Sequence, residues 1–294
     1  MHPQIIRLKN EVCDRKKIKL SMLRLDEIHP VVSGNKIFKL HYFIDEAKSS
    51  THKQVITFGG AYSNHLAATA FVCKKEGLKS VGIVRGEKSG TLSPTLKFCL
   101  ENQMQLEFIS RFSYRNACSA EFTNSLIEKY GTHTLIPEGG FSQKGAKGAE
   151  MIMDTFNKKD HTHVCCAIGT ATTFAGLING CDNIHIIGFS VLKNLDDIEE
   201  RLKKLNADKP KKYSIVNNYH FGGYAKKTNE LVSFMNTFYE DNKVPLDFVY
   251  TGKMMFGVYD LMTKNYFPNA SNILCIHTGG LQGNQSLAAG VLNF

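Results

Sequence analysis

Short apolar segments alternate with helical segments along most of this chain, and this alternation limits the fold more than any other feature of the sequence. An apolar run at 55–58 precedes a helix expected over 63–77, and a run at 163–168 precedes a helix expected from about residue 174. The runs are apolar throughout, as in parallel strands that are buried on both faces. The pattern predicts an α/β fold of parallel sheets with flanking helices.

The alternation restarts after residue 142, which predicts two domains around a cleft. We expect a large domain of residues 1–38 and 143–294 and a small domain of residues 39–142. The remaining elements expected are a strand region within 12–30, strands at 80–84, 106–109, 133–136, 184–189, 248–251 and 273–278, helices at 37–48, 92–103, 115–130, 144–158, 194–206, 224–240 and 253–264, and a short last helix.

The composition is that of a globular protein. Of 294 residues, 43% are hydrophobic and 21% are charged, which argues against disorder. The apolar runs fall well short of a membrane span, and the first ten residues lack the apolar core of a signal peptide. We therefore expect a cytoplasmic protein that has no membrane partner.

The formal net charge of +9 raises the question of nucleic-acid binding. The basic residues are dispersed in short runs such as 16–17, 203–204 and 211–212, and no recognition-helix or aromatic-platform motif accompanies them. Solvated helix faces explain this distribution better, so we expect no nucleic-acid partner. The net field would still favour an anionic cofactor or substrate.

The cysteines do not have the spacing of a metal site. No Cys-x-x-Cys pair and no histidine cluster at ligand spacing occurs, so we expect no metal. We expect buried free thiols, which suit a reducing compartment. The eight cysteines are Cys13, Cys73, Cys99, Cys118, Cys165, Cys166, Cys181 and Cys275.

Glycine-containing turns follow five of the expected strands, at 59–60, 139–140, 169, 252 and 279–280. Ligands of open parallel sheets gather at these carboxyl ends, where glycine permits close approach of the backbone. One glycine turn of this kind is ordinary, but five, four of them with hydroxyl side chains nearby, indicate a ligand site.

The turn Gly169-Thr170-Ala171-Thr172-Thr173 opens a helix and is a candidate phosphate cup, because helix N-termini bind anions. A threonine-rich helix cap is the equally weighted alternative. The turn matches neither a Walker loop nor Gly-x-Gly-x-x-Gly, which disfavours ATP and NAD.

Lys36 is the candidate for covalent chemistry, because it stands at a loop-to-helix junction before 37–48. Desolvation lowers the pKa of a lysine, and its neutral amine can bond to an aldehyde cofactor. Our hypothesis is that Lys36 holds pyridoxal phosphate as a Schiff base and faces the turn at 57–65. A solvated surface lysine is the alternative. Ser63 is a candidate nucleophile or proton carrier, and equally a helix N-cap.

With these residues in view, the chain resembles the family that joins 1-aminocyclopropane-1-carboxylate (ACC) deaminase and D-cysteine desulfhydrase. The resemblance runs from about residue 24 to the C-terminus. The motifs that carry it are His-Pro-x-x-Ser-Gly-Asn-Lys-x-x-Lys-Leu at 29–40, Phe-Gly-Gly-Ala-Tyr-Ser-Asn-His at 58–65, Ile-Pro-Glu-Gly-Gly at 136–140, Tyr-His-Phe-Gly-Gly-Tyr-Ala at 219–225, Val-Tyr-Thr-Gly-Lys at 249–253 and His-Thr-Gly-Gly at 277–280.

The resemblance implies pyridoxal phosphate as cofactor, a fold like that of the tryptophan synthase β-subunit, a small amino-acid substrate and a homodimer. It implies that Lys36 bonds to the cofactor and that 169–173 hold its phosphate. It further implies that Asn64 contacts the cofactor ring and that Ser63, Asn64 and His65 receive the substrate carboxylate. Ser63 and Tyr250 would take part in catalysis, and Tyr224 and Tyr250 would lie near the substrate.

Two positions favour the desulfhydrase branch. The deaminase branch has Glu after the tyrosine that matches Tyr250 and Leu before the final Gly-Gly, whereas this chain has Thr251 and Thr278. A carboxylate beside the pyridine nitrogen would strengthen the electron sink, and thiolate leaves readily without it. The chain departs from the family before the His-Pro, where Leu23-Arg24-Leu25-Asp26 stands in place of Lys-Arg-Asp/Glu-Asp, and in the phosphate loop, where Ala171 and Thr172 replace glycines.

The leading functional hypothesis is therefore α,β-elimination of D-cysteine or a related D-amino acid, giving pyruvate, ammonia and sulfide. Deamination of ACC on the same scaffold is the second hypothesis. The third is a binding protein, or a paralogue that acts on another small amino acid, and the altered phosphate loop is its support. A nucleic-acid binder ranks fourth.

Overall fold

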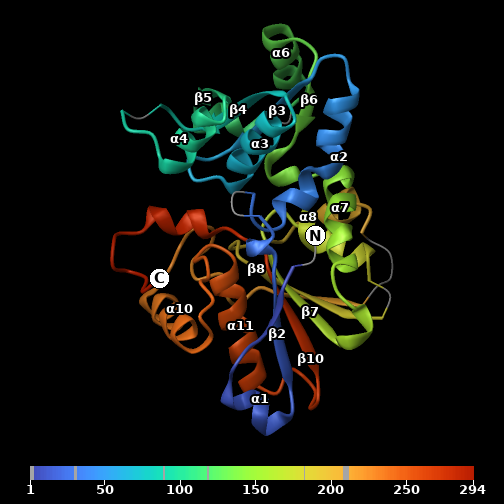
Figure 1. The fold of residues 1–294 in the computed structure, drawn as a ribbon, viewed down its shortest axis with the longest axis vertical. Coiled ribbons are helices and arrows are strands. Elements are labelled where there is room, and N and C mark those ends of the chain that lie inside the picture. Colours follow the sequence, from blue (N-terminus) through green and yellow to red (C-terminus); the bar gives the residue numbers. More distant parts are fainter. Residues whose placement is uncertain (1–2, 30–31, 89, 118, 182, 208–211) are drawn as a thin grey trace.

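The computed structural model describes residues 3–29, 32–88, 90–117, 119–181, 183–207 and 212–294. Two sheets organise the chain, and Figure 1 shows the smaller one above the larger one. The larger sheet has the strand order β1-β2-β10-β7-β8-β9 and the smaller one the order β5-β4-β3-β6. Their strands are β1 (Ile5–Arg7), β2 (Lys19–Arg24), β3 (Gln54–Gly59), β4 (Lys79–Arg85), β5 (Gln105–Ile109), β6 (Thr134–Ile136), β7 (His163–Ile168), β8 (His185–Ser190), β9 (Tyr213–Val216) and β10 (Asn272–His277).

The strands pair in parallel except at one edge, where β1 runs antiparallel to β2. Each sheet has helices on both faces, as buried parallel sheets require. The helices are α1 (Glu11–Lys16), α2 (Lys36–Ser49), α3 (Asn64–Lys75), α4 (Pro94–Glu101), α5 (Arg111–Arg115), α6 (Ala120–Tyr130), α7 (Gln143–Glu150), α8 (Thr172–Asn179), α9 (Ile198–Lys204), α10 (Asn229–Asn242) and α11 (Thr251–Thr263).

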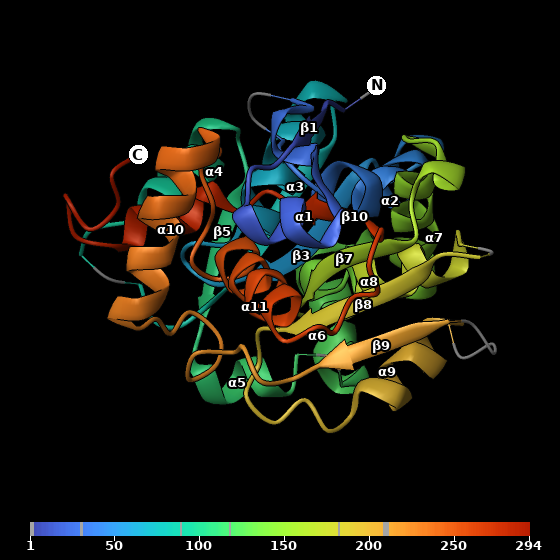
Figure 2. The ribbon, with the colours of Figure 1, turned by 90° about the horizontal axis from the view of Figure 1, so that it is seen from below.

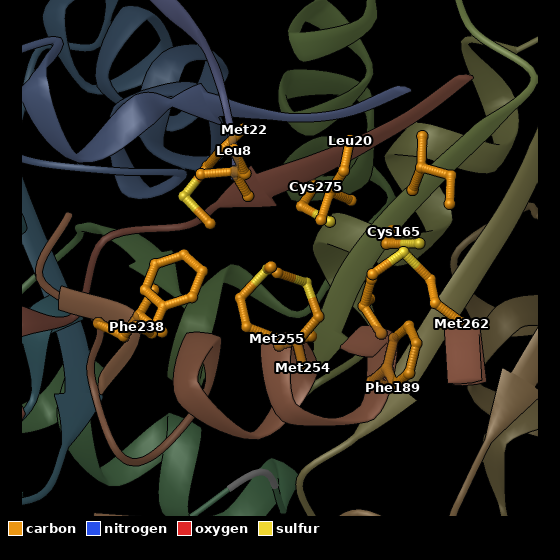
Figure 3. Close-up of a cluster of buried hydrophobic side chains, with 14 of the residues drawn as sticks. Leu8, Leu20, Met22, Cys165, Phe189, Phe238, Met254, Met255, Met262 and Cys275 are labelled. Carbon is orange, nitrogen blue, oxygen red and sulfur yellow. The ribbon is translucent and has the colours of Figure 1, made fainter. Parts of the chain in front are cut away.

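Successive residues of a strand enter different hydrophobic clusters, because side chains alternate between the faces of a sheet. Cys165 packs with α1, α10 and α11 on one face of the larger sheet, and Cys166 packs with α7, α8 and α9 on the other. Figure 3 shows the first cluster, in which Cys165 and Cys275 face Met255 and Met262 of α11. Figure 2 shows the same sheet from below, with β9 and α9 at its far edge.

In the smaller sheet, α2, α3 and α4 pack on one face and α5 and α6 on the other. All four strands of this sheet lie between residues 54 and 136. The domain limits expected at 38/39 and 142/143 stay a prediction. The expectation of buried free thiols holds for the seven described cysteines, and Cys118 lies outside the described residues.

The prediction of a strand at 248–251 is wrong. These residues form a turn that leads into α11, because the carboxylate of Asp247 accepts hydrogen bonds from the backbone N–H groups of residues 249, 250 and 251 at 2.7–3.0 Å. This local capping overrides the apolar character of the run.

Other boundaries also differ from expectation. Helix α1 occupies part of the expected strand region within 12–30, and Asn10 caps it. The helix expected over 115–130 begins only at Ala120, as α6, and the separate helix α5 ends at Arg115. The helix expected over 224–240 begins only at Asn229, after the N-cap Thr228. Helix α7 ends at Glu150 and is followed by 3₁₀ turns at Met151–Asp154 and Lys158–Asp160. The expected last helix is a 3₁₀ helix, Leu281–Ser286. Further 3₁₀ turns lie at Leu25–Glu27 and Glu138–Gly140.

The close contact between α2 and α7 generates a prediction about stability. A Cβ atom at Gly148 would lie 2.1 Å from the carbonyl oxygen of Phe38. The substitution Gly148→Ala must therefore push the two helices apart, and we expect it to lower the free energy of unfolding by about 1–3 kcal/mol. Urea titration followed by circular dichroism measures this. Gly90→Ala is the control, because its Cβ would meet no atom within 4 Å; equal effects of both substitutions would contradict the packing argument.

Candidate active site

A cavity lies where the carboxyl ends of strands from both sheets meet. It is lined by residues of the loop before α2, the first residue of α3, the turn after β6, the β7–α8 turn, the start of α11 and the turn after β10. Residues far apart in the sequence, such as Lys36, Asn64, Tyr250 and Thr278, therefore share one cavity. Among the described residues, no group of three or more His, Cys, Asp or Glu could hold a metal ion.

Lys36 is the first residue of α2, and its side chain lines the cavity. Burial lowers the pKa of Lys36 to about 8, and the carboxylate of Asp247 opposes this shift. Its amine donates a hydrogen bond to Asn35 Oδ1 at 2.6 Å. A lysine in this setting provides a neutral, nucleophilic amine near physiological pH.

Asn35 links this lysine to the predicted phosphate cup. Its side-chain Nδ2 donates to Thr173 Oγ1 at 2.7 Å, while its Oδ1 accepts from Lys36. Asn35 is buried, so both hydrogen bonds are shielded from water. Sequence reasoning used Asn35 only as a letter of a motif, and its position before Lys36 was the available signal.

Lys39 also lines the cavity, and it is buried whereas Lys36 is partly buried; sequence reasoning did not single it out. Burial lowers the pKa of Lys39 well below its ordinary value, and the neighbouring Lys36 lowers it further. It lies three residues after Lys36 on α2, so helical periodicity could have placed both on one face. A bound anion would compensate these two cationic groups.

The β7–α8 turn has the form of an anion cup. All five predicted residues, Gly169, Thr170, Ala171, Thr172 and Thr173, line the cavity. Ala171 is the N-cap of α8 in a left-handed conformation (φ 69°) and gives the helix no side-chain cap. The Ala171 side chain cannot accept hydrogen bonds from the first N–H groups of α8, so these groups can bind an anion. Helix α8 begins at Thr172, two residues before the expected start.

The N-terminus of α3 carries three of the predicted residues, and only one of them lines the cavity. Asn64 does, and its Oδ1 is buried without a hydrogen-bond partner among the described residues. Ser63 is the N-cap of α3, and its hydroxyl accepts a hydrogen bond from Leu66 N at 3.3 Å, which agrees with the N-cap alternative for this residue.

His65 points into the small sheet. Its Nε2 hydrogen-bonds Thr57 Oγ1 at 2.9 Å, and Thr57 Oγ1 in turn donates to the carbonyl of Ile136. Thr57 therefore accepts from His65, so that Nε2 carries the proton. Burial lowers the pKa of His65 well below its ordinary value, and Lys39 and Lys36 lower it further, which keeps the ring neutral. The side chain is suited to orienting α3 rather than to binding a carboxylate.

Tyr250 lines the cavity beside the cup, because a Cβ atom at Gly169 would lie 3.0 Å from its Cε1. Burial raises the pKa of Tyr250 well above its ordinary value, and the neighbouring Tyr224 adds to the shift. The two rings meet edge to face with centroids 6.0 Å apart, and Tyr224 is half exposed.

The two threonines that distinguish the branches differ in position. Thr278 lines the cavity, whereas Thr251 is absent from the lining and fully buried. Thr251 Oγ1 donates to Asp247 Oδ2 at 2.5 Å and accepts from the backbone N–H of Asp247 at 2.9 Å. The structure therefore directs Thr251 toward Asp247, a buried carboxylate that sequence reasoning did not identify.

Known proteins share this architecture. A family model described as pyridoxal-phosphate-dependent enzyme matches residues 12–279. A protein of Thermotoga maritima named putative ACC deaminase is 29% identical, over 96% of this chain and 95% of its own length. A crystal structure described as the ACC deaminase homologue aligns with a TM-score of 0.82 at 25% identity, covering 97% of this chain and 91% of that chain. Threonine deaminase isoform 2 from Solanum lycopersicum shares the fold (TM-score 0.67, 17% identity, 95% and 79% covered). The expected fold class is confirmed.

The cavity fits pyridoxal phosphate. The cup at 169–173 offers helix N–H groups to a phosphate, and Lys36 and Lys39 offer compensating charge. The buried, unpartnered Oδ1 of Asn64 is a polar atom that a ligand in the cavity would satisfy. Lys36 is the residue that would hold the cofactor aldehyde, because Asn35 links its amine to Thr173 of the cup and burial favours its neutral form.

This assignment predicts which lysine the cofactor modifies. After incubation with pyridoxal phosphate and reduction with borohydride, peptide mass spectrometry should find the label on Lys36. Lys36→Ala should lose the label and the visible absorption band, whereas Lys39→Ala should keep the label on Lys36. A label on Lys39 in the wild-type protein would refute the assignment.

The lowered pKa of Lys36 predicts how cofactor capture depends on pH. Only the neutral amine attacks an aldehyde, so the capture rate of cofactor-free protein should rise with pH and level off above about pH 8. Stopped-flow absorbance measures the rate. The reference is N-acetyl-lysine, whose rate should keep rising toward its ordinary pKa of about 10.4; a protein profile that follows the reference would contradict the burial of Lys36.

Proposed function

This chain belongs to the family of pyridoxal-phosphate-dependent enzymes, and from that premise we propose that it catalyses α,β-elimination of D-cysteine or a related D-amino acid. The overall reaction is D-cysteine plus water giving pyruvate, ammonia and hydrogen sulfide. The observation that carries the proposal is the lining of the cavity. Among the described residues, that lining includes two lysines and the Thr278 hydroxyl but no carboxylate.

The residues that line the cavity affect how strongly a bound cofactor would withdraw electrons from the substrate. When bound, pyridoxal phosphate accepts electron density from the substrate α-carbon, and a carboxylate beside its ring nitrogen would strengthen that effect. The carboxylate of Asp247 is occupied by three backbone N–H groups and the Thr251 hydroxyl. A weaker sink suits the departure of thiolate, which is a good leaving group, better than the opening of a cyclopropane ring.

Lys36 is the proposed base. Once its amine is released from the cofactor, it would remove the proton from the substrate α-carbon, and the electron pair left there would expel thiolate from the β-carbon. The released aminoacrylate takes up water and yields pyruvate and ammonia. The burial that lowers the pKa of Lys36 to about 8 keeps a useful fraction of its amine neutral.

The remaining residues would bind the substrate. The N-terminus of α3, formed by Ser63, Asn64 and His65, would receive the substrate carboxylate through backbone N–H groups and the partial positive charge of the helix end. Tyr250 would contact the substrate beside the cup, with Tyr224 next to it. Ser63 is retained as a candidate for proton transfer, and Thr278 as the hydroxyl facing the cofactor ring.

Deamination of ACC is the second proposal. It is supported by the names of the relatives, putative ACC deaminase and ACC deaminase homologue. The lining of the cavity favours elimination over it. We further propose a homodimer, on family resemblance alone, and a cytoplasmic location, because the buried free thiols of the described cysteines suit a reducing compartment. No described helix is long and apolar enough to cross a membrane.

The substrate assignment is tested by the visible spectrum of the cofactor-loaded protein before and after addition of D-cysteine, with pyruvate and sulfide assayed. We expect the absorption band to shift and pyruvate and sulfide to form in equal amounts, because one elimination releases both. Lys36→Ala should lower the rate of product formation at least about a thousandfold.

L-cysteine and ACC serve as controls in the same assay. ACC would give 2-oxobutanoate and ammonia without sulfide, so the products separate the two proposals. A loaded protein that leaves D-cysteine unchanged but converts ACC would overturn the first proposal and favour the second. Conversion of neither would overturn both.

A further inference from the structure

A loop of residues 219–225 lies along one side of α11, and we name it the 219–225 loop. Its residues contact the helix in reverse order. Tyr219 donates its hydroxyl to Asp260 Oδ2 at 2.5 Å, and Phe221 packs edge to face on Phe256 with centroids 4.9 Å apart. At the other end of the loop, Tyr224 meets Tyr250, the residue that precedes α11.

The helix residues in these contacts share one stripe. Positions 250, 253, 256–257 and 260 are three or four residues apart, which is the spacing of one helix face. Gly257 belongs to the same stripe, because a Cβ atom there would lie 2.8 Å from Tyr219 Cδ2. The loop therefore follows α11 from Asp260 to the wall of the candidate active site.

Lys253 occupies the middle of this stripe. Its side chain is fully buried, and its amine donates to the carbonyl oxygens of His220 at 2.9 Å and Gly223 at 2.7 Å. These carbonyls also close two consecutive turns, since they accept from Gly223 N and Lys226 N. A buried lysine ammonium is costly unless it is hydrogen-bonded, and here the loop backbone supplies the partners.

The loop backbone needs such support. Phe221 and Ala225 have positive φ angles of 50° and 53°, and Gly222 and Gly223 have φ angles of 90° and 111°. Left-handed conformations of non-glycine residues are unfavourable and persist only where surrounding contacts impose them. Lys253 bonds to the loop backbone between the ring contacts at the two ends, within the stretch that has these positive φ angles.

We propose that Lys253 is a positioning residue that holds the 219–225 loop against α11 and thereby keeps Tyr224 on Tyr250 at the wall of the candidate active site. Its contacts are to the loop backbone, and its influence on substrate passes through Tyr224. The inference that the loop faces an amino-acid substrate rests on the proposed function. The inference that Lys253 holds the loop does not depend on that function.

The first test is independent of turnover. Hydrogen–deuterium exchange of the cofactor-loaded full chain, resolved by mass spectrometry, should show amides of residues 220–226 exchanging at least about tenfold faster in Lys253→Met than in wild type. Lys253→Arg, which keeps a charged donor, should recover part of the protection. Lys204→Met is the matched control, because it removes an exposed lysine of α9 and should leave the loop unchanged. Equal loop exchange in Lys253→Met and wild type would overturn the proposal.

The second test asks whether Lys253 acts through Tyr224. Lys253→Met should raise KM for the accepted substrate by about tenfold with a change in kcat below about twofold, since it disturbs binding rather than the reacting groups. In a Tyr224→Ala background the same substitution should add no further increase in KM. An additive increase would overturn the route through Tyr224.

The two tests separate this inference from the proposed function. If D-cysteine is not a substrate, wild-type protein yields no sulfide, while the exchange comparison still reports on the loop. If Lys253→Met does not fold, Lys253→Leu takes its place, because it is also apolar and has no hydrogen-bond donor. Wild-type exchange at residues 220–226 in that variant would overturn the proposal.

Discussion

Burial of the Lys36 amine is the constraint on which the rest of this structure depends. A charged lysine away from water is unfavourable, so its pKa falls to about 8, and the surroundings must accommodate both its charged and its neutral form. Asn35 provides an acceptor, Asp247 provides a distant counter-charge, and Thr173 fixes the orientation of Asn35. The lysine is thereby connected to the anion cup by hydrogen bonds rather than by chain proximity.

The electrostatic balance around the cavity is cationic. Lys36 adds to the lowering of the pKa of Lys39 by burial, and both lysines add to the lowering of the pKa of His65, so its ring stays neutral. Asp247 is a buried carboxylate that raises the pKa of Lys36, and its oxygens accept hydrogen bonds within the turn that leads into α11. An anionic ligand at the cup would complete the balance, which agrees with a phosphate-bearing cofactor.

Helix α11 connects the wall of the candidate active site to the 219–225 loop. Its first turn is fixed by Asp247 and places Tyr250 beside Gly169, and its next turns bind the 219–225 loop through Lys253 and Asp260. The wall of the cavity and the loop that extends it are thus positioned by a single helix. Close packing at Gly257 and Gly252 allows the helix to approach its neighbours.

The sequence by itself determined the alternating α/β fold through its apolar strand segments, and the cofactor family through motifs that resemble those of known enzymes. The residues expected at the site, namely Lys36, Asn64, 169–173, Tyr250 and Thr278, line one cavity, and their roles stay predictions. Side-chain direction at 63–65 and at Thr251 was decided by the tertiary structure, since it depends on partners such as Thr57 and Asp247. The strand expected at 248–251 failed for the same reason. Asn35 and Lys39 had only their spacing from Lys36 as a local signal. Asp247 and Lys253 had none, because their contacts are created by folding and buried carbonyl partners leave no pattern in the sequence.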